Sequence, residues 1–136
     1  MRVVVDFEWD EPGEVRLSDI GRLAIPGVPK TAGVYRFRIH PSARIETYIG
    51  QAKLLNRRMR SYVGTHTGPT CSRIREVLLL HLLSGNDVSC SIALPAVIEI
   101  NGEMITPDMS VGHVRLLIEN AALAAAINAG EHVHNL

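Results

Sequence analysis

The sequence of 136 residues is poor in cysteine, in aromatic side chains and in long apolar runs. Its two cysteines, Cys71 and Cys90, lack metal-site spacing, so we expect reduced thiols, as in a cytoplasmic protein. No apolar run approaches the ~20 residues that a membrane span needs. The first residues turn acidic by Asp6, unlike a secretion signal. The composition therefore predicts one globular cytoplasmic domain without a membrane partner.

The net charge is zero, and this value alone argues against a nucleic-acid partner. The distribution of charge reverses that conclusion. Segment 30–75 holds ten basic residues and one acid, Glu46, whereas the flanking segments 1–29 and 76–136 are acidic. Segregated charge can give a neutral protein one basic face, and the field of such a face attracts a polyanion. The alternative is that these cations only solvate strands and a helix.

The same basic segment contains all the tyrosines of the chain, Tyr35, Tyr48 and Tyr62. β-Branched and aromatic residues predict a strand over 33–39, and proline chemistry predicts a turn over 40–43. A second strand, antiparallel to the first, is expected over 45–49 and to end at Gly50. Apolar residues at helical spacing then predict a helix over 52–63 with a basic opposite side.

The N-terminal segment shows a valine-rich strand over 2–9 and a partner strand over 15–17. A short helical turn capped by Ser18 should follow. We expect this segment to pack along one edge of the central sheet. It carries no recognisable chemistry.

The second half of the chain alternates helical and strand patterns. We expect a loop over 64–70 with an exposed His66, a helix over 72–83 closed by Gly85, a strand over 88–94, a hairpin over 97–105 with its turn at Asn101-Gly102, and a helix over 109–128 ended by Gly130. The buried side of the last helix is predicted to hold Val114, Leu117, Ile118, Ala121, Leu123 and Ala125.

Two short motifs stand in order on the central hairpin: Gly33-Val34-Tyr35, then Tyr48-Ile49-Gly50. The pair resembles the signature of the GIY-YIG nuclease superfamily. Arg58 stands eight residues after Gly50, on the first helix, where that family carries its phosphate-contacting arginine. Tyr62 matches a further tyrosine or histidine of the family.

The resemblance continues at the other end of the chain, so that it covers about residue 32 to the C-terminus. The segment 117–120 resembles the helix that carries the family's single metal-binding glutamate, here Glu119. The terminal His134-Asn135-Leu136 is similar to the segment with its closing asparagine. The resemblance implies an α+β fold, in which a small antiparallel sheet of three core strands, with extra N-terminal and hairpin strands, is flanked by about three helices. It implies a nuclease domain over 30–136, with 1–29 as an extension packed on it.

The activity that the resemblance implies is Mg²⁺- or Mn²⁺-dependent hydrolysis of DNA phosphodiester bonds. Tyr35 would be the general base for the attacking water and Tyr48 would orient it, although the two could exchange roles. Arg58 would stabilise the charge on phosphorus, because its planar fork of donors suits phosphate oxygens. The remaining implied roles are a phosphate contact by Tyr62, the metal site at Glu119 and a brace by Asn135.

A single carboxylate suits Mg²⁺, which keeps several waters and binds substrate phosphates directly. A nearby cation also lowers the pKa of tyrosine, which is otherwise about 10 and too high for a base. The expected nucleic-acid contacts are Arg36, Arg38, Lys53, Arg57, Arg60 and Arg73, and the expected structural glycines are Gly33 and Gly50.

Two features depart from the family pattern. Gln51 follows the second motif where repair-type members carry a lysine, so cationic assistance must come from Lys53 or an arginine. The gap from Glu119 to Asn135 is long, and Asn120 or Asn128 could serve instead.

Two other functions remain open from the sequence. The first is a domain of the same fold that binds nucleic acid without cutting it. The second is a protein-interaction domain that uses the edge of the 97–105 hairpin. Because the sequence holds no helix-turn-helix or zinc finger, target choice would rest on the domain's own loops, on dimerisation or on a separate targeting protein.

Overall fold

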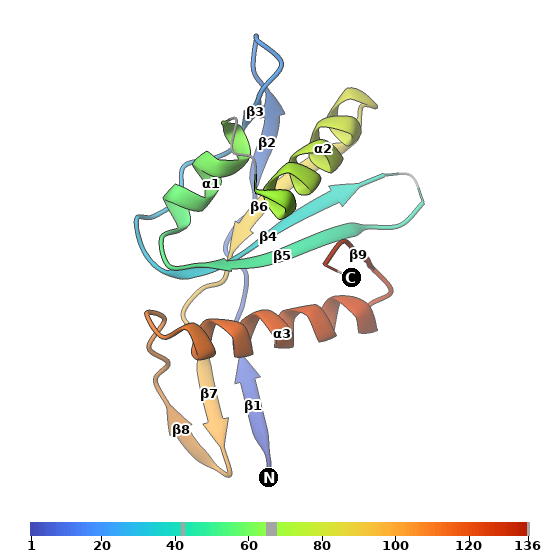
Figure 1. Ribbon diagram of the computed structural model, residues 1–136. Coiled ribbons are helices and arrows are strands. Elements are labelled where there is room, and N and C mark those ends of the chain that lie inside the picture. Colours follow the sequence, from blue (N-terminus) through green and yellow to red (C-terminus); the bar gives the residue numbers. More distant parts are fainter. Residues whose placement is uncertain (42, 65–67, 136) are drawn as a thin grey trace.

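The computed structural model describes residues 1–41, 43–64 and 68–135. The elements follow one another as β1 (Val3–Asp6), β2 (Gly13–Leu17), β3 (Leu23–Ala24), β4 (Gly33–His40), β5 (Glu46–Ala52), α1 (Leu55–Val63), α2 (Pro69–Leu83), β6 (Asp87–Ile92), β7 (Val97–Ile100), β8 (Glu103–Ile105), α3 (Gly112–Asn128) and β9 (His132–Val133). The strands form a sheet of order β3-β2-β6-β4-β5-β9 and a smaller one of order β1-β7-β8 (Figure 1). The predicted α+β class is confirmed.

Strand β4 is the centre of the larger sheet, because it pairs antiparallel with both β5 and β6. Its register with β5 places Tyr35 opposite Gly50 and Phe37 opposite Tyr48. The expectation that Gly50 ends the second strand is wrong, since β5 continues to Ala52. Gly50 belongs in the strand because the Tyr35 ring lies over it, and a Cβ at this position would overlap the Tyr35 hydroxyl. The expected turn between these strands includes Ser42, which lies outside the described residues.

The two faces of the larger sheet bury different cores, because successive side chains of a strand point to opposite sides. Tyr35, Phe37 and Tyr48 belong to one core, together with buried residues of α1 and α2. Val34 and Ile49 belong to the other, which α3 covers. Figure 1 shows α1 and α2 on one side of this sheet and α3 on the other.

The N-terminal strands exist, but they do not pair with each other as expected. β1 pairs with β7 in the smaller sheet, and β2 pairs with β6 and β3 in the larger one. The chain crosses between the sheets after β1, where Trp9 forms a bridge to Ala93 and the Asp10 carboxylate accepts the Ile92 amide. Segment 1–29 therefore supplies strands to both sheets. Ser18 closes a turn rather than a helix, because Gly21 has a φ of 74°.

The two helices that cover the tyrosine side of the larger sheet, α1 and α2, begin at residues other than the predicted ones. α1 begins at Leu55 because β5 occupies the residues up to Ala52. α2 begins at Pro69, ahead of the expected Ser72, because proline suits the first position of a helix, where no amide donor is needed. Residues 65–67 of the predicted loop, with His66, lie outside the described residues. Gly85 ends α2 with a φ of 83°, as expected.

The buried stripe of helix α3 agrees with the prediction only in part: Ile118 is buried as expected, and Val114 and Leu123 are partly buried against the same core. Its buried residues are Arg115, Ile118, Ala122 and Ala126, whereas Leu117 is 36% exposed. An arginine can be buried here because its guanidinium donates to the Gln51 side chain at 2.6 Å and to the Met109 and Ser110 carbonyls at 3.0 Å.

The 97–105 hairpin is confirmed, and both turn residues have positive φ, 50° at Asn101 and 85° at Gly102. A short strand after α3, β9, had no counterpart among the predictions. It pairs in parallel with the start of β5, which places His132 beside Glu46. No helix in the described part of the chain is long and apolar enough to span a membrane.

Candidate active site

Three tyrosines from β4, β5 and α1 meet on one face of the larger sheet. The ring centroid of Tyr35 lies 6.3 Å from that of Tyr48 and 6.1 Å from that of Tyr62. The hydroxyls of Tyr35 and Tyr62 are 2.6 Å apart and share a hydrogen bond. Tyr35 and Tyr62 are 1% and 0% exposed, whereas Tyr48 is 9% exposed. The structure thus brings three of the predicted site residues together from positions up to 27 residues apart.

Burial and neighbouring charge act in opposite directions on these phenols. Burial raises the pKa of Tyr35 well above its ordinary value and Tyr48 adds to this, while the bond from Tyr62 and the charge of Arg58 lower it. Burial, followed by the proximity of Tyr35, raises the pKa of Tyr62 as well. Both phenols are therefore neutral at physiological pH, and the hydrogen bond of Tyr62 and the charge of Arg58 offset only part of the effect of burial on Tyr35.

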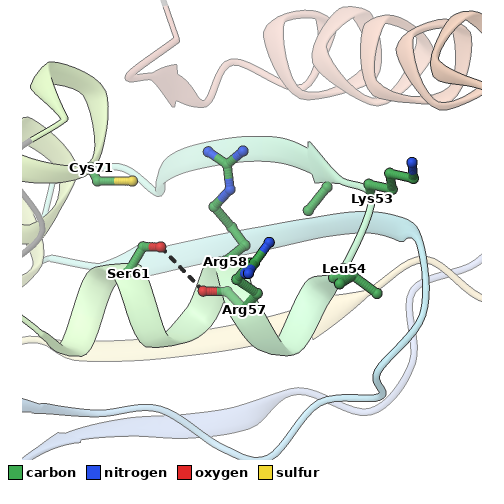
Figure 2. Close-up of a pocket in the computed structure, with 7 residues that line it drawn as sticks. Lys53, Leu54, Arg57, Arg58, Ser61 and Cys71 are labelled. Carbon is green, nitrogen blue, oxygen red and sulfur yellow. Dashed lines mark hydrogen bonds between the residues drawn. The ribbon is translucent and has the colours of Figure 1, made fainter.

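Arg58 connects the tyrosines to the surface. It lines a cleft of about 290 Å³ between the end of β5, α1 and the start of α2. Two more cations, Lys53 and Arg57, lie on its walls, and none of the described lining residues is acidic. Figure 2 shows the Arg58 guanidinium rising from α1, with the Cys71 sulfur directed toward it from α2. A cleft with this lining favours an anion.

The charge of Arg58 is itself well supported. Partial burial opposes that charge, but the nearby Tyr35, Tyr62 and Cys71 outweigh it, so the pKa of Arg58 is raised. Arg58 therefore stays cationic beside the tyrosines.

The two glycines of the motifs make room for neighbouring side chains. A Cβ on Gly33 would lie 2.7 Å from a methyl carbon of Leu55, the first residue of α1. A Cβ on Gly50 would overlap Tyr35. Because these two glycines have no side chain, α1 and the Tyr35 ring can pack closely against the β4–β5 pair.

Asn135 lies against the second motif. Its Oδ1 accepts the Ile49 amide at 3.0 Å, and its Nδ2 donates to the Ile49 carbonyl at 2.6 Å. The side chain therefore extends the ladder that β9 starts on the outer edge of β5. The alternatives Asn120 and Asn128 are exposed on α3. Leu136 lies outside the described residues.

Glu119 lies on α3, on the other side of the sheet from the tyrosines. It follows by one turn Arg115, which holds the Gln51 side chain directly after the second motif. Residues Ala121 and Ala125 of the opposite flank of α3 line a pocket beside β1. Helical geometry therefore directs Glu119 away from β1, toward the β5 edge of the sheet.

The carboxylate of Glu119 is half-buried, and burial raises its pKa. Among the described residues, none donates a hydrogen bond to it, and no contact joins it to the tyrosines. A bound cation would relieve the cost of burying this charge.

The other predicted nucleic-acid contacts are divided between surfaces. Arg36 and Arg38 share the α3 side of the sheet: Arg36 stacks over Trp9 at 4.4 Å, and Arg38 pairs with Glu131 at 3.3 Å. Burial, helped by Arg38, lowers the pKa of Arg36 to about 10.

The two remaining arginines lie on separate surfaces. Arg60 is on another flank of α1, beside the 25–28 segment. Arg73 donates to the His134 carbonyl at 2.8 Å. Only Lys53 and Arg57 share the cleft of Arg58.

A second polar cluster, which was not predicted from the sequence, is formed by Glu46, His81, His132 and His134. The signal was present as a His-x-His spacing near the C-terminus and as the lone acid of the basic segment. Without the parallel pairing of β9 with β5, nothing in the sequence connects the two.

Comparison with known proteins gives a likeness of structure. No protein-family model matches the chain, and no curated protein matches it. A solved structure of a mutant of bacteriophage T4 EndoII is similar over 85% of this chain and 86% of its own, with a TM-score of 0.54 and 19% sequence identity. At this identity the likeness is one of fold.

Proposed function

We propose that this protein is a divalent-metal-dependent endonuclease of the GIY-YIG type that hydrolyses DNA. The observation that carries the proposal is the hydrogen bond between Tyr35 and Tyr62 beside Arg58, because Arg58 lines a cleft whose described residues are all cationic or uncharged. The fold supports it, because EndoII is a nuclease. Phosphodiester hydrolysis needs a base for water and positive charge at the phosphorus, and these groups can supply both.

Tyr35 is the general base in this proposal. The charge of Arg58 and the hydrogen bond of Tyr62 both favour its ionised form, against burial. A phosphate entering the cleft would meet Arg58, whose guanidinium can donate two hydrogen bonds to the non-bridging oxygens. Tyr48, the more exposed neighbour on β5, would orient the attacking water.

The metal site is assigned to Glu119. A half-buried carboxylate without a partner among the described residues suits Mg²⁺ or Mn²⁺, which take one or two protein oxygens and keep several waters. When bound, the ion supplies Lewis-acid stabilisation to the phosphate and the leaving oxygen. Asn135 holds Ile49, and thereby the strand between Tyr48 and Gly50, in place.

The direct test incubates supercoiled plasmid with the protein in Mg²⁺ and in EDTA. Nicking or linearisation is expected only with the metal, and it should be lost in Glu119→Ala and in Arg58→Ala. Glu76→Ala, which removes an exposed carboxylate from α2, is the matched control and should cut normally. Undiminished cutting by both site variants would refute the assignment.

The alternative function is a domain of the same fold that binds nucleic acid without cleaving it. The cationic cleft is the observation that favours it, because Lys53, Arg57 and Arg58 alone could hold a phosphate backbone. Salt-sensitive binding of DNA by the folded protein, with no metal-dependent product on any substrate tested, would favour this function.

A further inference from the structure

The C-terminal strand presents two histidines to the start of β5. In β9 and the residue after it, His132 and His134 alternate with Val133, which is buried under α3. The alternation places both imidazoles on the opposite face. Because β9 runs parallel to β5 and pairs His132 with Glu46, the Glu46 carboxylate lies on the same face.

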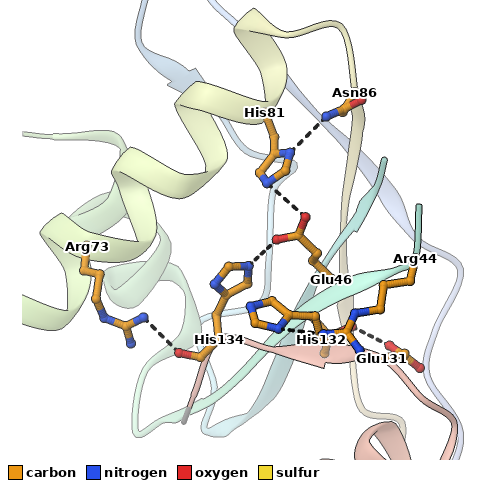
Figure 3. Close-up of polar contacts among 9 residues, drawn as sticks. Arg44, Glu46, Arg73, His81, Asn86, Glu131, His132 and His134 are labelled. Carbon is orange, nitrogen blue, oxygen red and sulfur yellow. Dashed lines mark hydrogen bonds and ion pairs between the residues drawn. The ribbon is translucent and has the colours of Figure 1, made fainter. Parts of the chain in front are cut away.

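The three side chains converge closely (Figure 3). One donor atom each from Glu46, His132 and His134 can be chosen so that all lie within 4.8 Å of one another. The His134 Nε2 is 2.6 Å from the Glu46 Oε1, and the two imidazole centroids are 4.7 Å apart. This face of the sheet also carries the tyrosines, but none of these three residues belongs to the cleft of Arg58.

A second layer of groups orients the cluster. The Nε2 atom of His81, on α2, lies 3.3 Å from the other carboxylate oxygen of Glu46. The side-chain amide nitrogen of Asn86 lies 2.9 Å from the Nδ1 atom of His81. If Asn86 donates to that nitrogen, a neutral His81 carries its proton on Nε2 and donates it to Glu46. The Glu46 carboxylate is then oriented by a hydrogen bond from α2. Arg73 fixes the backbone of His134. Outer partners of this kind are typical of metal ligands.

We propose that Glu46, His132 and His134 form a binding site for Zn²⁺ or a transition-metal ion of similar chemistry. Two imidazole nitrogens and one carboxylate oxygen are the donors that zinc prefers, whereas Mg²⁺ prefers oxygen. The site is thus chemically distinct from the one assigned to Glu119. Zinc–nitrogen bonds of ~2.0–2.1 Å put tetrahedral ligands ~3.4 Å apart. Donor atoms as far as 4.8 Å apart must therefore approach by about 1.4 Å, and the pair at 2.6 Å must separate by about 0.8 Å.

The surroundings permit this adjustment. His132 is exposed, and so is Arg44, whose guanidinium lies 3.3 Å from the His132 Nδ1. The arginine can therefore turn into solvent when an ion binds. Its charge opposes a cation, while the carboxylate of Glu46 favours one.

A bound ion would fasten the C-terminal segment to the sheet. Without it, β9 is held to β5 by few backbone bonds, including those from the His132 amide to the Ile45 carbonyl and from the His134 amide to the Thr47 carbonyl. The next residue, Asn135, braces Ile49. The ion therefore acts as a structural clamp, and this role does not depend on nuclease activity.

The test titrates metal-free protein with Zn²⁺ in competition with a chromogenic chelator. We expect one ion per chain, not displaced by a thousandfold excess of Mg²⁺. At a hundred times the dissociation constant, Zn²⁺ should raise Tm by roughly 8 °C. Hydrogen exchange of the His134 amide should slow when the ion is bound.

The variants separate this site from incidental histidine binding. His132→Ala removes an exposed side chain and should lower affinity at least ~100-fold, and His81→Ala should lower it ~10-fold. His113→Ala, an exposed histidine of α3, is the matched control and should bind as wild type. Circular dichroism of the metal-free variants checks folding. Absence of stoichiometric binding, or unchanged affinity in His132→Ala, overturns the proposal.

Discussion

Tyr62 is buried completely, and its hydroxyl contacts the Tyr35 phenol. Among the described residues, the Tyr62 hydroxyl is the one protein group that forms a hydrogen bond with the Tyr35 phenol, and that bond lowers the pKa of Tyr35. In the proposed nuclease, Tyr62 is thus a positioning residue that helps its neighbour to ionise. The phosphate contact expected from the family resemblance would require this side chain to leave the core.

Replacing Tyr62 by phenylalanine should therefore slow cleavage without abolishing it. A hydrogen bond to a charged group contributes ~1.5–3 kcal/mol, so the rate at neutral pH should fall roughly 10- to 100-fold. The rising limb of the rate profile should move to higher pH, because Tyr35 then ionises less readily. The measurement is the pH dependence of kcat/KM on a DNA substrate. An unshifted profile would show that Tyr62 does not affect the ionisation of the general base.

At the scale of elements, the outer edge of β5 is the critical feature. β9 pairs only with its first two residues, and Asn135 extends the pairing to Ile49. Ile49 is 1% exposed, so its amide and carbonyl cannot turn to water instead. The second motif is thus held by a side chain 86 residues away.

Asn135→Ala should destabilise the protein by about 1–3 kcal/mol, because it leaves buried backbone groups without partners. Urea unfolding followed by circular dichroism measures the change in free energy. Asn128→Ala is the matched control, since that residue is exposed at the end of α3, and its effect should stay within ~0.5 kcal/mol. Equal changes in the free energy of unfolding for the two substitutions would contradict the stabilising role of Asn135.

At the scale of the whole molecule, the buried tyrosines couple folding to alkaline pH. Burial raises the pKa of both Tyr35 and Tyr62, so the folded chain keeps protons that the unfolded chain releases above pH ~10. The folded state then binds more protons than the unfolded state, and the free energy of unfolding falls as pH rises. Below the unfolded pKa the stabilisation is fully present.

We therefore expect the free energy of unfolding to decline between pH 10 and 11.5, with a shallower decline in Tyr35→Phe. Urea titrations across this range measure both slopes. Deprotonation of surface lysines affects the two proteins alike, so the difference in slope isolates the tyrosine. Parallel slopes would show that Tyr35 ionises as easily in the folded chain as in the unfolded one.

The local pattern of the sequence determined the α+β class, the central hairpin, the 97–105 hairpin and the glycine that ends α2. These features depend on alternation, helical period and turn chemistry, which act over a few neighbouring residues. The tyrosine and arginine motifs were recognisable for the same reason, because they stand within 30 residues of one another.

Only the tertiary structure decided the features that depend on distant partners. Gly50 remains in its strand because Tyr35 fills the space above it, and Arg115 is buried because Gln51 accepts its hydrogen bond. The parallel pairing of β9 with β5 brings His132 and His134 to Glu46, across more than 80 residues. Such pairings are set by which surfaces the whole chain can bury together, and no local pattern contains that information.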